Sequence, residues 1–208
     1  MATSATGLEA IQDIKKMMER SSRFISLSGW SGISAGVCAL AGAFAARQRI
    51  AVYQDSPGAI PCADCLRREL LLIAVVVFIV AFCSAGAFTW VKARKDGVKI
   101  WGKASRRLLW NTLLPMVAGG FVLWRMIGLA QYDLLAAGSL IFYGLALVNG
   151  SKYTMGEVRY LGYAQIITGI AGLWLPGSGL YVWATGFGLW HIVYGIAMWW
   201  KYERSAQA

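Results

Sequence analysis

The sequence predicts an all-α integral membrane protein, a bundle of six transmembrane helices, and three observations support this fold class. Apolar residues make up 58% of the 208 residues and charged residues only 14%, against roughly 45–50% and about 25% in soluble domains. The mean hydropathy is +0.54. The basic residues, which give a net charge of +10, fall between apolar segments, where topology signals are found.

The N-terminal segment, residues 1–23, predicts a short amphipathic helix that precedes the membrane domain of residues 24–204. Thr6 and Glu9 have the spacing of a helix capping box. Apolar residues from Leu8 to Met18 then recur at helical spacing. Such a helix lies on the cytoplasmic membrane surface or packs on the cytoplasmic face of the protein itself.

Six apolar segments follow, and each approaches the roughly 20 residues that a membrane-spanning helix needs. Turn signals at 130–133 and 176–179 divide the longer apolar stretches. An outer-loop insertion is predicted at about 47–69. The predicted spans lie near residues 24–46, 70–91, 108–129, 132–151, 159–175 and 179–200.

The positions of the basic residues predict the orientation of these spans. With six spans and the N-terminus inside, most of the 20 Lys and Arg residues fall on the inner side, as the positive-inside rule requires. Trp and Tyr gather near both ends of the predicted spans, as in aromatic belts. We therefore predict a bacterial inner-membrane protein with both termini in the cytoplasm.

The spans carry a weak internal repeat that predicts three related two-helix hairpins. Odd-numbered spans share a glycine thirteen residues after an arginine, and even-numbered spans share a glycine before their inner ends; the matched glycines are Gly36, Gly120 and Gly172, and Gly86, Gly144 and Gly195. With 24 glycines in the chain, coincidence is the alternative. Under the repeat, the insertion at 47–69 is the added element of the first hairpin.

That insertion contains the sequence Pro61-Cys62-Ala63-Asp64-Cys65-Leu66-Arg67-Arg68. A helix N-terminus and two neighbouring arginines favour the thiolate form of Cys62 and Cys65. An oxidising compartment favours a disulfide between them. The pair is interpreted as a structural disulfide, a reduced pair, or a redox site in which Arg67 and Arg68 favour the thiolate.

This short segment resembles the quinone-linked disulfide-forming membrane oxidoreductases, which carry Pro-Cys-x-x-Cys in the first outer loop just before their second helix. The resemblance covers about ten residues. It implies that Cys62 and Cys65 exchange electrons with a quinone cofactor, and that Arg67 or Arg68 lies near it. That family has four helices and a second cysteine pair in its second outer loop, whereas the outer turns at 130–133 and 176–179 contain no cysteine.

A second candidate site consists of polar residues inside the predicted spans. These residues are His191, Tyr194, Tyr143, Thr168 and Gln165, all at similar or neighbouring depths. Polar groups within a membrane usually face the bundle interior and often mark functional sites. They predict either a path for a small solute or protons, or a set of hydrogen bonds between helices.

Three hypotheses for function follow, because no catalytic or cofactor motif in the sequence is specific enough to name a reaction. The first is a non-enzymatic accessory, sensory or scaffold component of a membrane assembly, in which the chain contacts the bilayer and either another copy of itself or another subunit. The second is a small-solute channel or permease, and the third is a thiol–quinone redox protein. The basic segment Lys92–Arg107 predicts contact with anionic lipids. The single His and the two thiols are too few ligands for a zinc site, and nucleic acid is not an expected partner.

Overall fold

The computed structural model describes residues 28–55, 62–97 and 100–204, and these residues contain helices and no strands. The predicted amphipathic helix at 1–23 and the start of the first predicted span lie outside the described residues. The predicted all-helical class is therefore confirmed for the part of the chain that can be described.

The described residues form six helical rods, the last of which is continuous from Gly179 to Glu203 and is called here the sixth helix. Each rod overlaps one predicted span. The rods are α2 (Gly29–Gln54), α3 (Ala63–Lys95), α4 (Lys103–Gly128), α5 (Leu135–Gly150) between the 3₁₀ turns η1 (Tyr132–Leu134) and η2 (Ser151–Tyr153), α6 (Val158–Leu173), and the sixth helix with its parts α7 (Gly179–Trp183), η3 (Ala184–Trp190), α8 (His191–Met198) and η4 (Trp199–Glu203).

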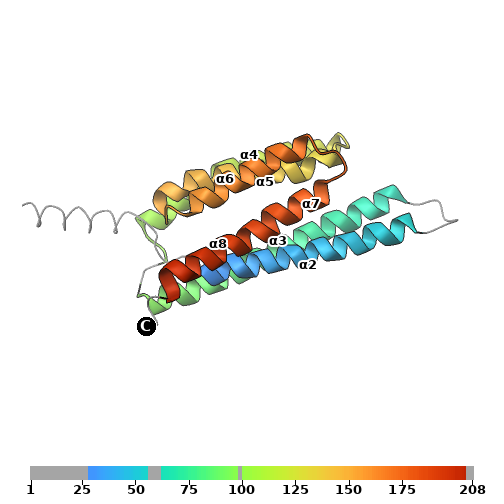
Figure 1. Ribbon diagram of the computed structural model, residues 1–208. Coiled ribbons are helices and arrows are strands. Elements are labelled where there is room, and N and C mark those ends of the chain that lie inside the picture. Colours follow the sequence, from blue (N-terminus) through green and yellow to red (C-terminus); the bar gives the residue numbers. More distant parts are fainter. Residues whose placement is uncertain (1–27, 56–61, 98–99, 205–208) are drawn as a thin grey trace, which may run out of the picture.

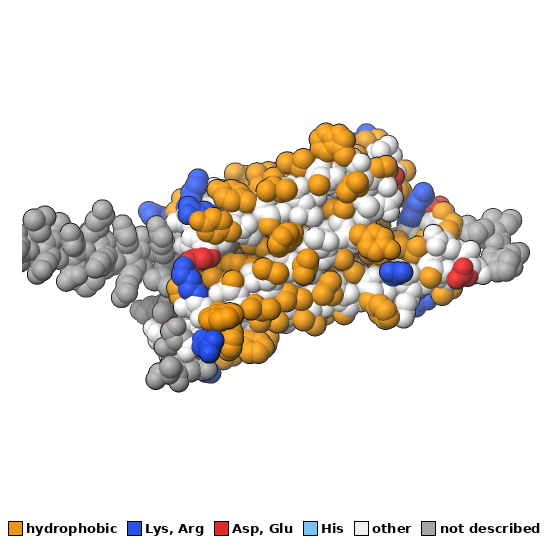
Figure 2. Space-filling model, viewed as in Figure 1, with side chains coloured by type: hydrophobic (Ala, Val, Ile, Leu, Met, Phe, Trp, Pro, Cys, Tyr) orange, Lys and Arg blue, Asp and Glu red, His pale blue; other side chains and the backbone are white. Residues whose placement is uncertain are grey.

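Four of these rods are long and apolar enough to cross a membrane: Gly29–Gln54, Ala63–Lys95, Tyr132–Tyr153 and Gly179–Glu203. The two others are α4, which contains Pro115, and α6, which has 16 residues. Figure 2 shows hydrophobic side chains covering the length of the bundle, with Lys and Arg gathered toward its two ends. By helix length and hydropathy, the chain is a candidate multi-pass membrane protein that contacts the lipid bilayer.

The first hairpin differs from its prediction, because most of the expected outer loop at 47–69 is helical. Residues 47–54 extend α2, and residues 63–69 belong to α3. No glycine or proline lies between Gly42 and Pro57, so nothing in the sequence interrupts α2 there. Cys62 then caps α3, since its Sγ accepts a hydrogen bond from the Cys65 N–H at 3.2 Å. The insertion therefore lengthens the hairpin instead of forming a long loop.

The helices are arranged in two layers of three (Figure 1). In one layer, α2 lies between α3 and the sixth helix; in the other, α5 lies between α4 and α6. The layers meet where α7 and η3 contact α5 and α6. On the opposite side of the bundle α3 and α4 scarcely contact each other, which leaves room between the layers there.

Glycines allow the closest helix crossings. A Cβ added at Gly195 would lie 2.6 Å from the carbonyl oxygen of Gly29, and one added at Gly29 would lie 2.6 Å from that of Gly195. Gly144 and Gly162 make an equivalent approach between α5 and α6, at 2.7 and 2.8 Å. Small residues of this kind let membrane helices pack backbone to backbone.

The packing does not follow the predicted hairpin repeat. Of the matched glycines, Gly86 and Gly120 face open space, whereas Gly36 and Gly195 lie in tight crossings. The third hairpin is also splayed, since the sixth helix packs mainly on α2 and α6 packs mainly on α5. The three-hairpin repeat therefore stays a prediction from the sequence pattern.

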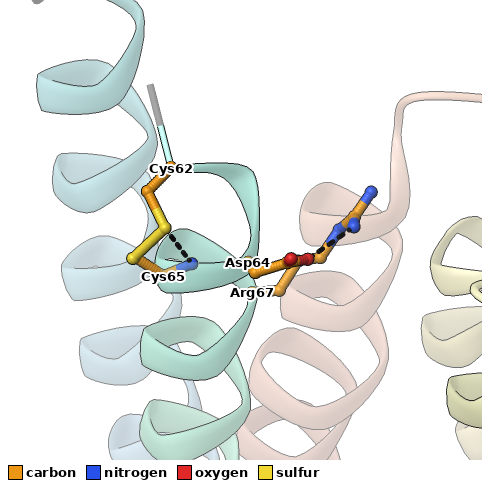
Figure 3. Close-up of a disulfide and its surroundings, with 4 residues drawn as sticks. All are labelled: Cys62, Asp64, Cys65 and Arg67. Carbon is orange, nitrogen blue, oxygen red and sulfur yellow. Dashed lines mark hydrogen bonds and ion pairs between the residues drawn. A yellow bond between two sulfur atoms is a disulfide. The ribbon is translucent and has the colours of Figure 1, made fainter. Parts of the chain in front are cut away.

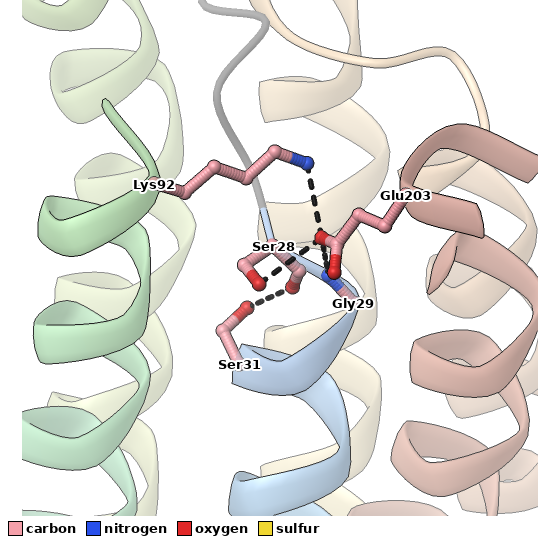
Figure 4. Close-up of polar contacts among 5 residues, drawn as sticks. All are labelled: Ser28, Gly29, Ser31, Lys92 and Glu203. Atoms are coloured by element: carbon pink, nitrogen blue, oxygen red, sulfur yellow. Dashed lines mark hydrogen bonds and ion pairs between the residues drawn. The ribbon is translucent and has the colours of Figure 1, made fainter. Parts of the chain in front are cut away.

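A carboxylate joins three helices at one end of the bundle, called here the Glu203 end. Figure 4 shows the Glu203 side chain reaching to the start of α2. Its Oε1 accepts hydrogen bonds from the Gly29 N–H at 2.8 Å and the Ser28 hydroxyl at 3.1 Å, and Lys92 Nζ of α3 lies 3.0 Å away. Because a helix N-terminus leaves N–H groups without partners, Glu203 caps α2 from the far end of the sequence.

Candidate functional site

The two layers enclose a cleft on the side where α3 faces α4. Its central chamber has a volume of about 400 Å³. All of its walls are mostly apolar, with small residues on α2, alanines and aromatic residues on α3, and Gly119 and Gly120 on α4. Tyr143 of α5 and His191 of the sixth helix are its main polar lining groups. The cleft is therefore a hydrocarbon-like space with polar groups on its wall.

A second chamber continues the cleft toward the disulfide end, the end opposite Glu203. Its volume is about 460 Å³, and it shares Ala74, Leu123, Ser139 and Trp183 with the central chamber. Arg67, Tyr132 and Asp133 lie among its lining residues. The Arg67 guanidinium lies 4.5 Å from the centre of the Tyr132 ring. The cleft therefore runs from the middle of the bundle to a polar, charged mouth.

The polar wall of the central chamber is a hydrogen-bonded network. Tyr143 Oη lies 2.9 Å from His191 Nε2, and His191 is only 6% exposed. On the other side of the imidazole, Gln165 Nε2 lies 3.3 Å from His191 Nδ1 and donates to the Gly186 carbonyl at 2.8 Å. The Tyr143 ring also stacks on His191 and contacts Phe187. Three helices thus hold one imidazole in place.

The sixth helix changes its winding beside this network. Residues Ala184–Trp190 form a π-helical segment, a local conformation that is rare and frequently found at functional sites. Gly186 lies within it and accepts the Gln165 hydrogen bond. A Cβ at Gly186 would meet Leu140 Cδ2 at 2.2 Å and Gln165 Oε1 at 2.8 Å. Only glycine therefore lets α5 and α6 approach this segment so closely.

Three of the five predicted intramembrane polar residues meet in this network, namely His191, Tyr143 and Gln165. Thr168 lies apart from it and accepts a hydrogen bond from Trp190 Nε1 at 3.0 Å. Tyr194 lines a separate groove of about 290 Å³ between α6 and α8. Its hydroxyl is buried without a hydrogen-bond partner among the described residues.

Cys62 and Cys65 form a disulfide at the disulfide end, and both residues are exposed. Figure 3 shows the disulfide on one side of the first turn of α3 and the Asp64–Arg67 ion pair on the other. Arg67 Nη1 lies 3.1 Å from Asp64 Oδ1. Arg67 lines the second chamber of the cleft, but neither cysteine lines either chamber. Arg68 is exposed and also lies outside both linings.

Glu157 forms a second polar cluster at the Glu203 end. Its carboxylate accepts hydrogen bonds from the Lys201 ammonium and from the Tyr202 hydroxyl. Burial alone would raise the pKa of this carboxyl, but the hydrogen bonds from Lys201 and Tyr202 outweigh burial and hold the pKa below its ordinary value. Glu157 is therefore a stable anion that fastens the start of α6 to the end of the sixth helix.

The sequence did not indicate the cleft, Gly186, or the cap that Glu203 gives α2. The paired glycines of 186–188 were the available signal for close packing, but the hydrogen bond from Gln165 to a backbone carbonyl has no sequence signature. No group of side chains that could hold a metal ion occurs within residues 28–55, 62–97 and 100–204.

Comparison with known proteins found no matching family model, no matching curated protein and no matching solved structure.

Proposed function

We propose that this protein is a non-enzymatic component of a bacterial inner membrane, with six spans, that holds an apolar molecule from the bilayer in the cleft between α3 and α4. Such a role is accessory or sensory: the protein would carry, present or detect a lipid-like molecule. One observation supports the proposal most directly. The largely apolar cleft opens beside α3, and the most apolar 18-residue stretch of α3 contains no buried residue.

The surroundings of the cleft decide the class of the occupant. The α3 window has a hydropathy of 2.8, so this flank faces hydrocarbon if the helices cross the bilayer. A molecule that enters laterally must then be apolar over most of its length. Chambers of about 400 and 460 Å³ fall in the range of small-molecule sites, roughly 300–1,000 Å³.

The form of the cleft suits a lipid-like chain. Its two chambers share Ala74, Leu123, Ser139 and Trp183, so they form one continuous space along the bundle. An acyl or isoprenoid chain is thin enough to occupy both chambers and matches their mostly apolar walls.

The other two hypotheses find less support in this geometry. A polar solute path needs polar groups along its length, and the cleft offers mainly Tyr143 and His191 in its central part. A thiol–quinone reaction needs the disulfide beside the bound molecule, and Cys62 and Cys65 line neither chamber. Both hypotheses stay predictions, as does the contact of the basic segment Lys92–Arg107 with anionic lipid.

Filling the cleft tests the proposal. Gly120 lines the central chamber and has open space around the position of a Cβ, so Gly120→Phe places a ring in the cleft. Gly86 of α3 is also exposed and open but lines neither chamber, so Gly86→Phe is the matched control. The probe is a long-chain alkane carrying a photoreactive diazirine, added to the protein in phosphatidylcholine vesicles.

Mass spectrometry of the crosslinked peptides separates the cleft from the lipid-facing surface. We expect labelling of Met116 and Leu123, both cleft residues, to saturate and to be displaced by unlabelled alkane. Gly120→Phe should lose most of this saturable labelling, and Gly86→Phe should keep it. Labelling of these residues that rises linearly with probe and is the same in all three proteins would contradict the proposal.

A further inference from the structure

The mouth of the cleft lies where the turns between helices meet the start of α3. Tyr132 and Asp133 of the turn before α5 line the second chamber, and so does Gly177 of the turn before the sixth helix. Arg67 lines it from α3. The second chamber therefore ends at the level of the turns, which is the depth of lipid headgroups if the bundle crosses a bilayer.

Charged residues line the cleft only at this mouth. Arg67 and Asp133 both line the second chamber, whereas the lining of the central chamber contains no Lys, Arg, Asp or Glu. Arg67 pairs with Asp64, which lines neither chamber. Asp133 is exposed and forms no ion pair among the described residues. One positive and one negative residue, not paired with each other, thus line the mouth of an otherwise apolar space.

Arg67 keeps most of its hydrogen-bond donors available. Its Cζ lies 4.5 Å from the centre of the Tyr132 ring, and its Nη1 donates to Asp64 Oδ1 at 3.1 Å. Figure 3 shows the side chain pointing away from the disulfide. A guanidinium has five N–H groups, and the bond to Asp64 uses one of them. The others suit the oxygens of a phosphate, which arginine binds through two donors at once.

The charges around Arg67 decide which kind of headgroup fits. A purely anionic head would approach the Asp133 carboxylate, and Asp64 already offsets part of the arginine charge. A purely cationic head would approach Arg67. A head that carries both a phosphate and a primary ammonium satisfies both residues, because the phosphate accepts from Arg67 and the ammonium donates to Asp133.

We propose that the cleft binds a zwitterionic lipid of the phosphoethanolamine class, with its phosphate at Arg67, its ammonium at Asp133 and its acyl chain in the central chamber. The inference rests on the proposed binding function and adds the headgroup that is recognised. The head then lies at the level of the turns, and the chain lies between the apolar walls. A primary ammonium is favoured over a quaternary one, since only the primary group has N–H donors for a carboxylate.

Competition for the photoreactive alkane tests this inference with four compounds that share one saturated chain: the plain alkane, an alkylammonium, an alkyl phosphate and an alkyl phosphoethanolamine. The protein is kept in micelles of an uncharged maltoside detergent, so that no other charged head competes. The readout is the mole fraction that halves the saturable labelling of Met116 and Leu123. The phosphoethanolamine compound should reach this point at a mole fraction roughly 3- to 10-fold lower than any of the other three, the range for two partly exposed charge pairs.

Two variants assign the charges of the head. Arg67→Gln should remove the advantage of the phosphoethanolamine compound over the alkylammonium, and Asp133→Asn should remove its advantage over the alkyl phosphate. Competition by the plain alkane should stay unchanged in both variants, which also shows that they are folded. Comparing each variant with the wild-type protein cancels differences in how the compounds partition into micelles.

Two further variants and one soluble compound are the controls. Arg68 and Asp55 are exposed and line neither chamber, so Arg68→Gln and Asp55→Asn should keep the wild-type order of the four compounds. Free phosphoethanolamine, which has the head without the chain, should leave the labelling unchanged. Displacement of the probe by this soluble compound would overturn the assignment to a lipid.

The outcomes separate the two proposals. Equal competition by all four compounds in the wild-type protein would overturn the headgroup inference and leave the binding function standing; this comparison needs no variant. Stronger competition by the alkyl phosphate or the alkylammonium than by the phosphoethanolamine compound would overturn it as well, and so would an advantage that survives both Arg67→Gln and Asp133→Asn. Failure of all four compounds to displace the probe would overturn both proposals.

Discussion

Single side chains fasten the ends of this bundle, and Glu203 does so for three helices at once. Its carboxylate and the Lys92 ammonium are only 15% and 18% exposed, so their attraction is weakly screened compared with that of a surface pair. Glu203→Gln removes the charge and keeps the shape of the side chain. We expect the free energy of unfolding to fall by about 1–3 kcal/mol, measured by thermal unfolding of the protein in detergent micelles.

Glu69→Gln is the control for this prediction. Glu69 also forms an ion pair, with Arg49, but the two side chains are 52% and 61% exposed and lie 3.8 Å apart. Exposed pairs of this kind contribute about 0–1 kcal/mol, so this variant should unfold close to the wild-type temperature. Equal losses of stability in the two variants would show that Glu203 acts only through general surface charge.

Some helix crossings depend on glycine, because a Cβ at these positions would collide with backbone atoms of the neighbouring helix. At Gly195 the nearest atoms are the Gly29 carbonyl oxygen and the Ile33 nitrogen, both at 2.6 Å. Gly195→Ala should therefore push α2 and the sixth helix apart and cost about 1–3 kcal/mol of unfolding free energy. This loss would exceed the gain of up to about 1 kcal/mol that Ala has over Gly in a helix.

Gly86→Ala separates packing from helix propensity. Gly86 lies within α3, and a Cβ there has nothing within 4 Å. Only the higher helix propensity of alanine then affects stability, so this variant should be as stable as the wild-type protein or slightly more stable. Thermal unfolding of the two variants in the same detergent measures both effects, and a stabilised Gly195→Ala protein would contradict the crossing described above.

The sequence predicted the elements well where composition alone determines them. Each long apolar run became a helix, and the turns at 130–133 and 176–179 appear at Ala130 and Gly177, which have φ of 57° and 77°. The helix ends were predicted less well, because Arg47 and Arg49 are good helix formers although they are charged. Hydropathy therefore placed the end of α2 too early.

The candidate site was predictable only in part, for a geometric reason. Helical spacing and depth placed His191, Tyr143 and Gln165 at related levels, and the structure brings these three together. Depth does not specify the face of a helix, so Tyr194 was grouped with them although it faces α6 from another side. The cleft depends on α3 and α4 lying opposite each other without packing, which only the tertiary arrangement determines.

At the scale of the whole molecule, the two ends of the bundle should lie on opposite sides of the membrane. Asp96 follows α3 at the Glu203 end, and Asp133 lies in the turn before α5 at the disulfide end. In a background without the four native cysteines, Asp133→Cys should react with a membrane-impermeant maleimide in intact bacterial cells. Asp96→Cys should react only after the cells are permeabilised. The reverse pattern would contradict the proposed orientation.

The π-helical segment at Ala184–Trp190 sets how the two parts of the sixth helix are turned relative to each other. A π-helical bulge carries one more residue than the α-helix it interrupts, and one residue turns an α-helix by about 100°. Deleting one residue there and restoring α-helical winding would therefore turn His191, Gly195 and Glu203 together relative to Val182. With the segment present, one rod brings Val182 to Gly172 of α6 and His191 to Tyr143 of α5.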